Sequence, residues 1–273
     1  MTNLIIGGSS QLAHYFPAEY ERIDSHFIKE GLPLPLKSDF YDRIYVCFAE
    51  QRTFLNTSDY SLFSKTNIDD TIKILSFLSP KCNKLIIYGT AELWNNYEGP
   101  INIAMPFKYN HTPYILSKER MILSIHDSRS YGNFSNVIIL YPVNFNSPYR
   151  KSGFLFSKIF DSIINRQKIE IGDTYFYRDM IHPKYAVEQS IKAEKDEIIG
   201  SGRLIFVNDF IRILYSHFKM DYNEYVSENF IHNHTKQKIY YKDSRESLYS
   251  FDNLISDTIN DIEYARLQNK VGE

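Results

Sequence analysis

The chain has 273 residues, 43% of them hydrophobic, and a formal net charge of −2 at pH 7. This length and composition predict a globular protein with a sizeable core, and the near-neutral charge argues against a nucleic acid or an anionic membrane as partner. The two cysteines, Cys47 and Cys82, stand outside any metal-binding pattern, and no segment is typical of a signal peptide or membrane span, so we expect a cytoplasmic protein with free thiols and no bound metal.

The first residues predict a nucleotide-binding turn between two strands. Residues 3–6 form a short apolar strand that leads into Gly7-Gly8-Ser9-Ser10-Gln11-Leu12-Ala13, where a Rossmann fold places its phosphate-binding turn and the start of a helix. We expect Pro17 to cut that helix short and residues 20–24 to form the second strand. Asp24, at its end, is typical of a residue that binds the adenosine ribose and repels a 2′-phosphate. The alternative is a tight turn that binds no ligand.

The next segments continue the alternation of strands and helices. Residues 31–35 predict a loop that is shorter than the strand and helix usually found there. Residues 42–49 predict a buried strand whose following backbone borders a bound cofactor. Apolar side chains at helical spacing predict a helix over residues 67–78.

The segment from Lys84 to His126 carries the most informative pattern. Leu85-Ile86-Ile87-Tyr88 predicts a buried strand that stops at Gly89 and is followed by Thr90 and Glu92, and Pro113 predicts the first turn of a helix. Tyr114 and Lys118 share one face of that helix, so the Lys118 ammonium can lower the pKa of the Tyr114 phenol. Thr90 could hold a substrate oxygen, and Glu92 faces the same way as Thr90 if the chain stays extended. The Tyr-Lys pair alone is typical of a surface, but the order of strand, loop and YxxxK favours a site.

The remaining segments complete the predicted fold. A strand is predicted over residues 137–141, and amphipathic helices over residues 207–218 and 247–267. We therefore predict an α/β protein with a Rossmann-type doubly wound parallel sheet and a small C-terminal substrate lobe. The sheet domain is expected over residues 1–145, with 183–210 returning to it, and the substrate lobe mainly over residues 146–273.

These motifs resemble the extended short-chain dehydrogenase/reductase family, the NAD-dependent epimerases and dehydratases, and within it most closely the GDP-mannose 4,6-dehydratases. The similarity extends over nearly the whole chain, and its specific parts are residues 88–120, 144–159 and 177–187. The resemblance implies a nicotinamide cofactor, NAD or NADP, and a catalytic quartet of Thr90, Glu92, Tyr114 and Lys118.

The resemblance also implies binding residues. The cofactor-binding set is Gly7, Ser9, Ser10, Gln11, Leu12, Asp24, Ala49 and Lys118. The substrate-binding set is Asn146, Arg150 and Arg178, with His182 in a supporting role. A homodimer is implied through the helices at 67–78 and 113–126.

The chain departs from the family pattern at three places. Ser10 and Ala13 stand where the family's fingerprint has its second and third glycine. Asp24 stands where the dehydratases usually have a pair of arginines that suit NADP, which leaves the phosphorylation state of the cofactor open. The arginine that holds the nucleotide in those enzymes has no counterpart in residues 230–236, which leaves the nucleotide base open.

The resemblance implies a nucleotide-sugar 4,6-dehydratase that acts on a GDP-hexose or GDP-heptose through a 4-keto intermediate. An NAD(P)H-dependent 4-keto-sugar-nucleotide reductase is a close alternative that leaves Glu92 unused, and an epimerase is a third. A non-catalytic paralogue that binds a nucleotide sugar or a sister subunit is the alternative of another class, suggested by the loss of two glycines and of the arginine.

Overall fold

The computed structural model describes residues 2–55, 58–95, 97, 99–108, 112–229, 239–241 and 249–271. The chain divides into two compact units. The first unit holds residues 1–93, 106–142 and 187–199, and the second holds residues 94–105, 143–186 and 200–273. Each unit is therefore assembled from segments that lie far apart in the sequence.

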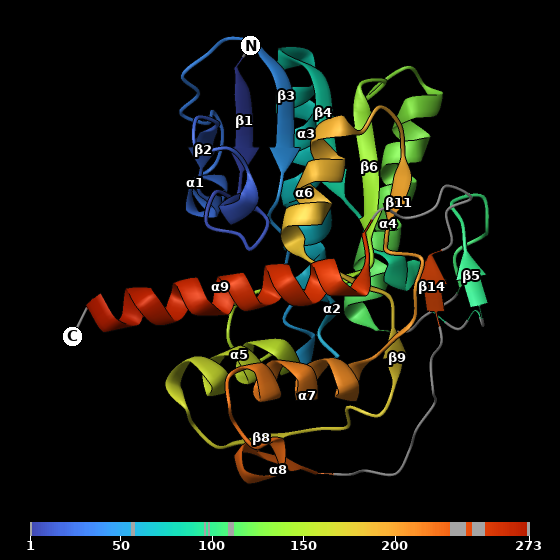
Figure 1. Cartoon of the computed structure of the whole chain (residues 1–273). Coiled ribbons are helices and arrows are strands. Elements are labelled where there is room, and N and C mark those ends of the chain that lie inside the picture. Colours follow the sequence, from blue (N-terminus) through green and yellow to red (C-terminus); the bar gives the residue numbers. More distant parts are fainter. Residues whose placement is uncertain are drawn as a thin grey trace. The chain divides into compact units, whose positions relative to one another are not determined.

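A six-stranded parallel sheet forms the centre of the first unit (Figure 1). Its strands, in spatial order, are β2 (Glu21–Ile23), β1 (Asn3–Ile6), β3 (Tyr41–Val46), β4 (Cys82–Tyr88), β6 (Val137–Pro142) and β11 (Glu197–Ile199). All six residues of β6 and the last four of β4 are buried, as expected for central strands of a parallel sheet that is covered on both faces.

The strand order reverses between β1 and β3, because the chain passes from β1 to β2 on one side and then returns to β3 on the other. This arrangement confirms the predicted doubly wound α/β fold. On the far side of β1 from β3 the sheet has one strand, β2. The short helix α1 (Ser25–Glu30) and a loop connect β2 to β3. The predicted short connection at residues 31–35 is confirmed.

The connection from β1 to β2 lacks the predicted α-helix. Only Ala13–Tyr15 winds, in a single 3-10 turn (η1), so the prediction of an α-helix cut short by Pro17 is wrong. Aromatic rings pack beside this turn instead: the centroid of the Phe16 ring lies 4.5 Å from that of Tyr45 and 6.1 Å from that of Tyr20. Phe16 and Tyr45 are buried, so these rings supply apolar contact in the absence of a helix.

Two helical segments pack against each other in the first unit. The first runs from α2 (Tyr60–Ser64) through a π-helical stretch (η3, Lys65–Asp70) into α3 (Thr71–Leu78), and the second is α4 (Pro113–Ser130). The predicted helix at residues 67–78 is thus the later part of a longer segment. Shorter 3-10 turns are η2 (Thr53–Leu55), η4 (Ser79–Lys81) and η5 (Ala91–Trp94).

The segment 187–199 completes the first unit. It contains the end of α6 (Pro183–Lys192) and all of β11. Tyr88 on β4 donates a hydrogen bond to Ser190 Oγ at 2.9 Å, and Arg43 on β3 donates one to Ala193 O at 2.7 Å. Both bonds fix this returning segment to the central strands.

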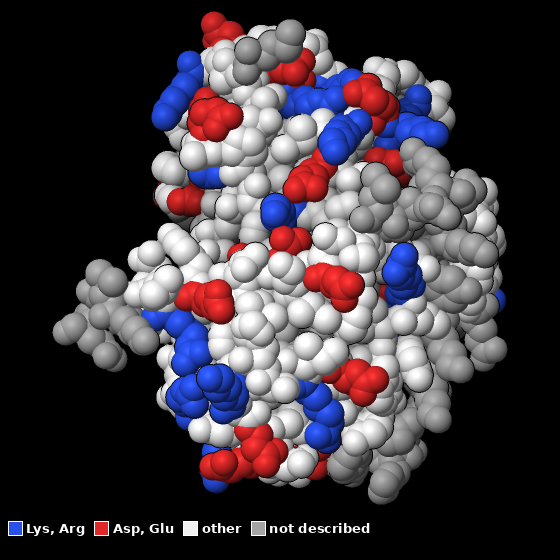
Figure 2. Space-filling model, in the orientation of Figure 1, with Lys and Arg blue, Asp and Glu red and all other residues white. Residues whose placement is uncertain are grey.

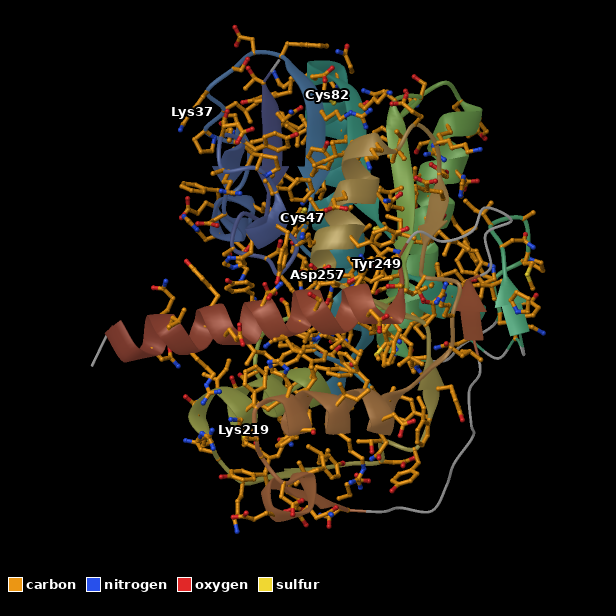
Figure 3. The ribbon with its side chains drawn as sticks, in the orientation of Figure 1. Lys37, Cys47, Cys82, Lys219, Tyr249 and Asp257 are labelled. Atoms are coloured by element: carbon orange, nitrogen blue, oxygen red, sulfur yellow. The ribbon has the colours of Figure 1, made fainter. Side chains whose placement is uncertain are left out.

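The second unit combines helices with two-stranded pairs. Its longer helices are α5 (Leu155–Asn165), α7 (Val207–His217) and α9 (Phe251–Val271), and α8 spans Tyr222–Tyr225. The pairs are β7 (Asn144–Phe145) with β10 (Met180–Ile181), β8 (Ile169–Ile171) with β13 (Val226–Glu228), β9 (Tyr177–Arg178) with β12 (Ile205–Phe206), and β5 (Gly99–Ile101) with β14 (Ile239–Tyr241). α9 contacts both α5 and α7. Before α9, Tyr249 donates a hydrogen bond to Asp257 Oδ2 at 3.2 Å, and Figure 3 shows the two residues near the start of this helix.

The surface carries charges of both signs. Figure 2 shows Lys and Arg interspersed with Asp and Glu on the face in view. Among the described residues, no helix is long and apolar enough to cross a membrane.

Candidate active site

The turn after β1 lies against the ends of β2 and β3. Gly7 has a φ of +90°, and a Cβ atom at this position would lie 2.9 Å from Phe48 N, so only glycine fits here without strain. The amide N–H groups of Gly7 and Gly8 both donate to Ile23 O, at 2.7 and 3.1 Å. The exposed Asp24 places its Oδ1 3.2 Å from where a Cβ of Gly8 would stand. The Gly7 and Gly8 amides are therefore engaged within the protein, while the glycine backbone leaves space for a diphosphate and the Asp24 carboxylate beside it suits a ribose.

The other residues of the predicted cofactor set have different environments. Ser9 is exposed and Gln11 half-buried, whereas Leu12 is buried in the core. Ser10 Oγ accepts a hydrogen bond from the amide of Ala13, the first residue of the 3-10 turn, at 3.3 Å. Ala49 is half-buried just after β3. The turn therefore offers backbone and small side chains, without the α-helix that a Rossmann turn normally precedes.

Lys118 joins α4 to the end of β4. Its side chain is only 3% exposed, and Nζ donates a hydrogen bond to Tyr88 O at 2.9 Å. Burial lowers the pKa of the Lys118 ammonium to about 8, because the charged form loses hydration there. The amine is thus fixed at the carbonyl of Tyr88, two residues before Thr90 in the sequence, and it is mostly protonated at neutral pH.

Thr90 and Glu92 follow β4 in a tight turn. Thr90 is buried, and its Oγ1 accepts a hydrogen bond from Glu92 N at 3.2 Å. Glu92 belongs to the 3-10 turn η5, so the condition that placed it on the same side as Thr90, an extended chain, is not met. Gly89 before them is also required, since a Cβ at this position would lie 2.8 Å from the Tyr141 ring.

Tyr114 lies in the first turn of α4, half-buried, with its ring centroid 6.3 Å from that of Phe63 in an edge-on arrangement. The carbonyl of Tyr114 accepts a hydrogen bond from Ser117 Oγ at 2.7 Å. The first turn of α4 is therefore fixed by a side chain of its own second turn.

Asn67 is a positioning residue that the sequence reasoning missed. It is 1% exposed and lies in the π-helical stretch, where its Nδ2 donates to Ser117 Oγ at 2.9 Å and to Glu50 O at 3.0 Å. Its Oδ1 accepts from Glu50 N at 2.8 Å. One amide thus ties the chain after β3, next to Ala49, to the helix that carries Tyr114. The only signal in the sequence was a polar residue at the start of an apolar helical pattern.

The predicted substrate-binding residues all belong to the second unit. Asn146 is half-buried after β7. Arg150 donates from Nη1 to Phe145 O at 3.1 Å, and its guanidinium lies 3.9 Å from the centroid of the Phe154 ring. Arg178 on β9 donates to its neighbour's carbonyl, Tyr177 O, at 3.0 Å and stacks over Phe176 at 4.7 Å. The sequence of residues 230–236 has no counterpart of the family arginine, and these residues lie outside the described part of the chain.

Two buried residues near Arg178, Asp179 and His182, hold the surrounding chain in place through hydrogen bonds. Asp179 accepts hydrogen bonds from Ser201 N and Oγ at 2.9 and 2.6 Å. His182 is 1% exposed, accepts from Lys184 N through Nδ1 at 3.3 Å, and lies 2.9 Å from Asp261 Oδ2 through Nε2. His182 thus ties the start of α6 to α9 within the second unit.

The two cysteine thiols are protonated near neutral pH. Both cysteines are free; Figure 3 shows Cys82 at the start of β4 and Cys47 after β3. Burial raises the pKa of both thiols, that of Cys82 to about 12, so neither is a thiolate near neutral pH. No group of three or more His, Cys, Asp or Glu side chains in the described ranges could hold a metal ion.

The chain is similar in structure to nucleotide-sugar enzymes with bound cofactors or substrates. UDP-glucose 4-epimerase of Thermotoga maritima, solved with UDP-glucose, has a TM-score of 0.76 at 15% identity, with 98% of this chain and 99% of the epimerase covered. dTDP-glucose 4,6-dehydratase of Streptomyces venezuelae, solved with NAD, has a TM-score of 0.75 at 16% identity and 98% coverage of both chains. RMD of Pseudomonas aeruginosa, solved with NADPH, has a TM-score of 0.74 at 13% identity, with 97% of this chain and 100% of RMD covered.

Sequence comparison adds no relative to these structures. The sequence matches no protein-family model and no curated protein. At these identities the structural likeness shows the fold alone. The chain therefore has the Rossmann-type fold of the NAD-dependent epimerases and dehydratases of the short-chain dehydrogenase/reductase family.

Proposed function

We propose that the protein is a nicotinamide-dependent nucleotide-sugar enzyme of the 4,6-dehydratase type, acting on a GDP-hexose or GDP-heptose. The observation that supports this most is the buried Lys118, whose Nζ is fixed to Tyr88 O at the end of β4. This bond holds the helix that carries Tyr114 against the strand end that carries Thr90. The bond joins two segments that the family pattern uses together.

In the proposed reaction, Tyr114 removes the proton from the sugar 4-hydroxyl while Thr90 binds the same oxygen. The Lys118 ammonium favours the Tyr114 phenolate by its charge and binds the nicotinamide ribose. Gly7–Leu12, Ala49 and Lys118 would hold the nicotinamide cofactor, which would supply reversible hydride transfer between C4 and C6 of the sugar. Glu92 takes the C5 proton, which the 4-ketone has made acidic, and gives it to the departing C6 hydroxyl, which leaves as water. Once C6 has been reduced, C5 takes up the proton held by the Tyr114 hydroxyl, which restores the phenolate.

The binding residues are part of the proposal. The turn at Gly7–Leu12 and Ala49 would hold the dinucleotide, with Asp24 on the adenosine ribose, which favours NAD over NADP. Asn146, Arg150 and Arg178 would bind the nucleotide sugar. The helices at 67–78 and 113–126 would form a homodimer contact, for which the exposed Leu123 on α4 offers apolar surface.

The test is formation of a 4-keto product from GDP-mannose or a GDP-heptose without added reductant, after loading with NAD or NADP. Tyr114→Phe should abolish turnover and keep the melting temperature. Tyr131→Phe is a matched control, because Tyr131 follows the end of the same helix and is 84% exposed. Native mass spectrometry should detect co-purified nicotinamide cofactor; a protein that neither carries nor binds one would support the non-catalytic alternative instead.

A 4-keto-sugar-nucleotide reductase is the second candidate. The folded turn at Glu92 favours it, since a reductase needs Thr90, Tyr114 and Lys118 but no base at C5. Consumption of NADH or NADPH only in the presence of a 4-keto sugar nucleotide, with Glu92→Gln fully active, would distinguish this enzyme from a dehydratase. An epimerase would interconvert sugars without net use of cofactor.

A further inference from the structure

The turn that would bind the cofactor's diphosphate is held without the usual helix. In a Rossmann domain the connection from the first to the second strand carries a helix, and its N-terminal N–H groups and dipole bind the diphosphate. Here the connection has only residues 7–20, with three of them in a 3-10 turn. A single turn supplies little dipole and leaves carbonyls without helical donors.

Arg22 on β2 supplies the missing donors. Its Nη2 lies 3.2 Å from Ala13 O, 3.0 Å from Phe16 O and 3.3 Å from Pro17 O. In a helix, the carbonyl of residue 13 would accept from the amide of residue 17, but proline has no N–H. The Arg22 guanidinium therefore donates the hydrogen bond to Ala13 O that Pro17 cannot donate.

The stem of Arg22 also contacts the start of the turn. A Cβ placed on Gly8 would lie 3.0 Å from Arg22 Cβ and 3.6 Å from its Cγ, so the arginine runs along the glycine backbone before it reaches the carbonyls. On the same side of Gly8 lies the Asp24 carboxylate. The turn is thus bordered by Arg22, whose guanidinium is always charged, and by the Asp24 carboxylate.

We propose that Arg22 is the positioning residue of the diphosphate-binding turn, replacing the backbone bonds of the absent helix and adding a positive charge to the connection. This inference rests on the proposed function in one respect, namely that the ligand of the turn is a dinucleotide. It predicts that the Arg22 charge stabilises bound diphosphate and that the Nη2 bonds to residues 13, 16 and 17 keep the connection in shape.

The test is the affinity of the wild type, Arg22→Lys and Arg22→Met for NADH and for ADP-ribose, measured by titration together with melting temperature. Arg22→Met should raise both dissociation constants about tenfold, which corresponds to about 1.4 kcal/mol. Arg22→Lys should raise them about threefold, because lysine keeps the charge and N–H donors but its shorter side chain does not reach all three carbonyls. The affinity of the wild type should fall more steeply with salt than that of Arg22→Met.

Arg43→Met is the matched control. Arg43 also donates to a backbone carbonyl, Ala193 O, in the same unit, but it stands on β3 at the returning segment. It should lower the melting temperature without changing either dissociation constant more than twofold. Equal effects of Arg22→Met and Arg43→Met on affinity, or no loss of affinity with Arg22→Met, would overturn this inference but not the proposed function. Absence of NADH, NADPH and ADP-ribose binding in the wild type would overturn the proposed function as well.

Discussion

Replacing Lys118 with methionine should abolish turnover and, at the same time, make the protein more stable at neutral pH. Lys118 is buried, and burial lowers its pKa from 10.5 to about 8. Methionine fills a similar volume without a charge, so it removes the cost of keeping an ammonium away from water.

The size and sign of the effect follow from this pKa. The unfolded chain binds the proton more tightly than the folded chain, so between pH 8 and pH 10.5 the free energy of unfolding rises with pH. Below pH 8 the amine is charged in both states, and the folded protein bears the full penalty, about 3 kcal/mol for a shift of this size. Loss of the hydrogen bond to Tyr88 O costs the variant about 1 kcal/mol. The net gain at pH 7 is about 2 kcal/mol, or about 5 °C in melting temperature.

The assay is urea unfolding of the wild type and Lys118→Met at several pH values from 7 to 10.5. The variant's advantage should shrink as the pH rises, vanish near pH 10 and reverse by pH 10.5, where the lost hydrogen bond outweighs the remaining penalty. Lys73→Met serves as control, since Lys73 is exposed on α3 and its replacement should give a difference independent of pH in this range. A variant that is less stable than the wild type at pH 7, or an advantage that does not change with pH, would refute the reasoning.

Three further variants probe the same unit. Asp24→Asn should raise the affinity for NADPH relative to NADH about tenfold, because a charge that repels the 2′-phosphate is removed; an unchanged ratio in parallel titrations would exclude that role. Gly89→Ala should cost about 1–3 kcal/mol in denaturant unfolding through its clash with the Tyr141 ring, and wild-type stability would contradict the tight packing. Asn67→Ala should cost about 2–4 kcal/mol and lower kcat, since it leaves Glu50 and Ser117 without their partner; full activity would argue against a positioning role.

The central strands and the helix at Pro113 could be predicted because their signals are local. Runs such as residues 85–88 are apolar, β-branched and bounded by glycine, and the central strands are buried on both faces, so pattern and burial agree. Proline at the first helical turn, after an extended Thr112, fixed the start of α4. These elements also fix where Thr90, Tyr114 and Lys118 lie in the sequence. Their joint action in one active site remains a prediction.

The parts that escaped prediction depend on contacts between residues distant in sequence. The helix expected before Pro17 is absent; Arg22 donates to carbonyls of this connection, and Phe16 and Tyr45 supply the apolar packing. Asn67 acts through residues 17 and 50 positions away. Glu92 was predicted to face the same way as Thr90 because side chains alternate along an extended strand. Instead, the Thr90 hydroxyl accepts a hydrogen bond from the Glu92 amide, and the chain turns there. No periodicity in the sequence reports such side-chain-to-backbone bonds.

The return of residues 187–199 to the first unit affects how the protein can be made in parts. A fragment that stops after β6 would lack β11, and β6, with all six residues buried in the full chain, would become an open edge prone to aggregation. It would also lose the partner of Arg129, since Asp196 binds both Nη atoms of that arginine and the amide of Ile139. During synthesis, the first unit would have to wait for residues 143–186 of the second unit before its last strand emerges.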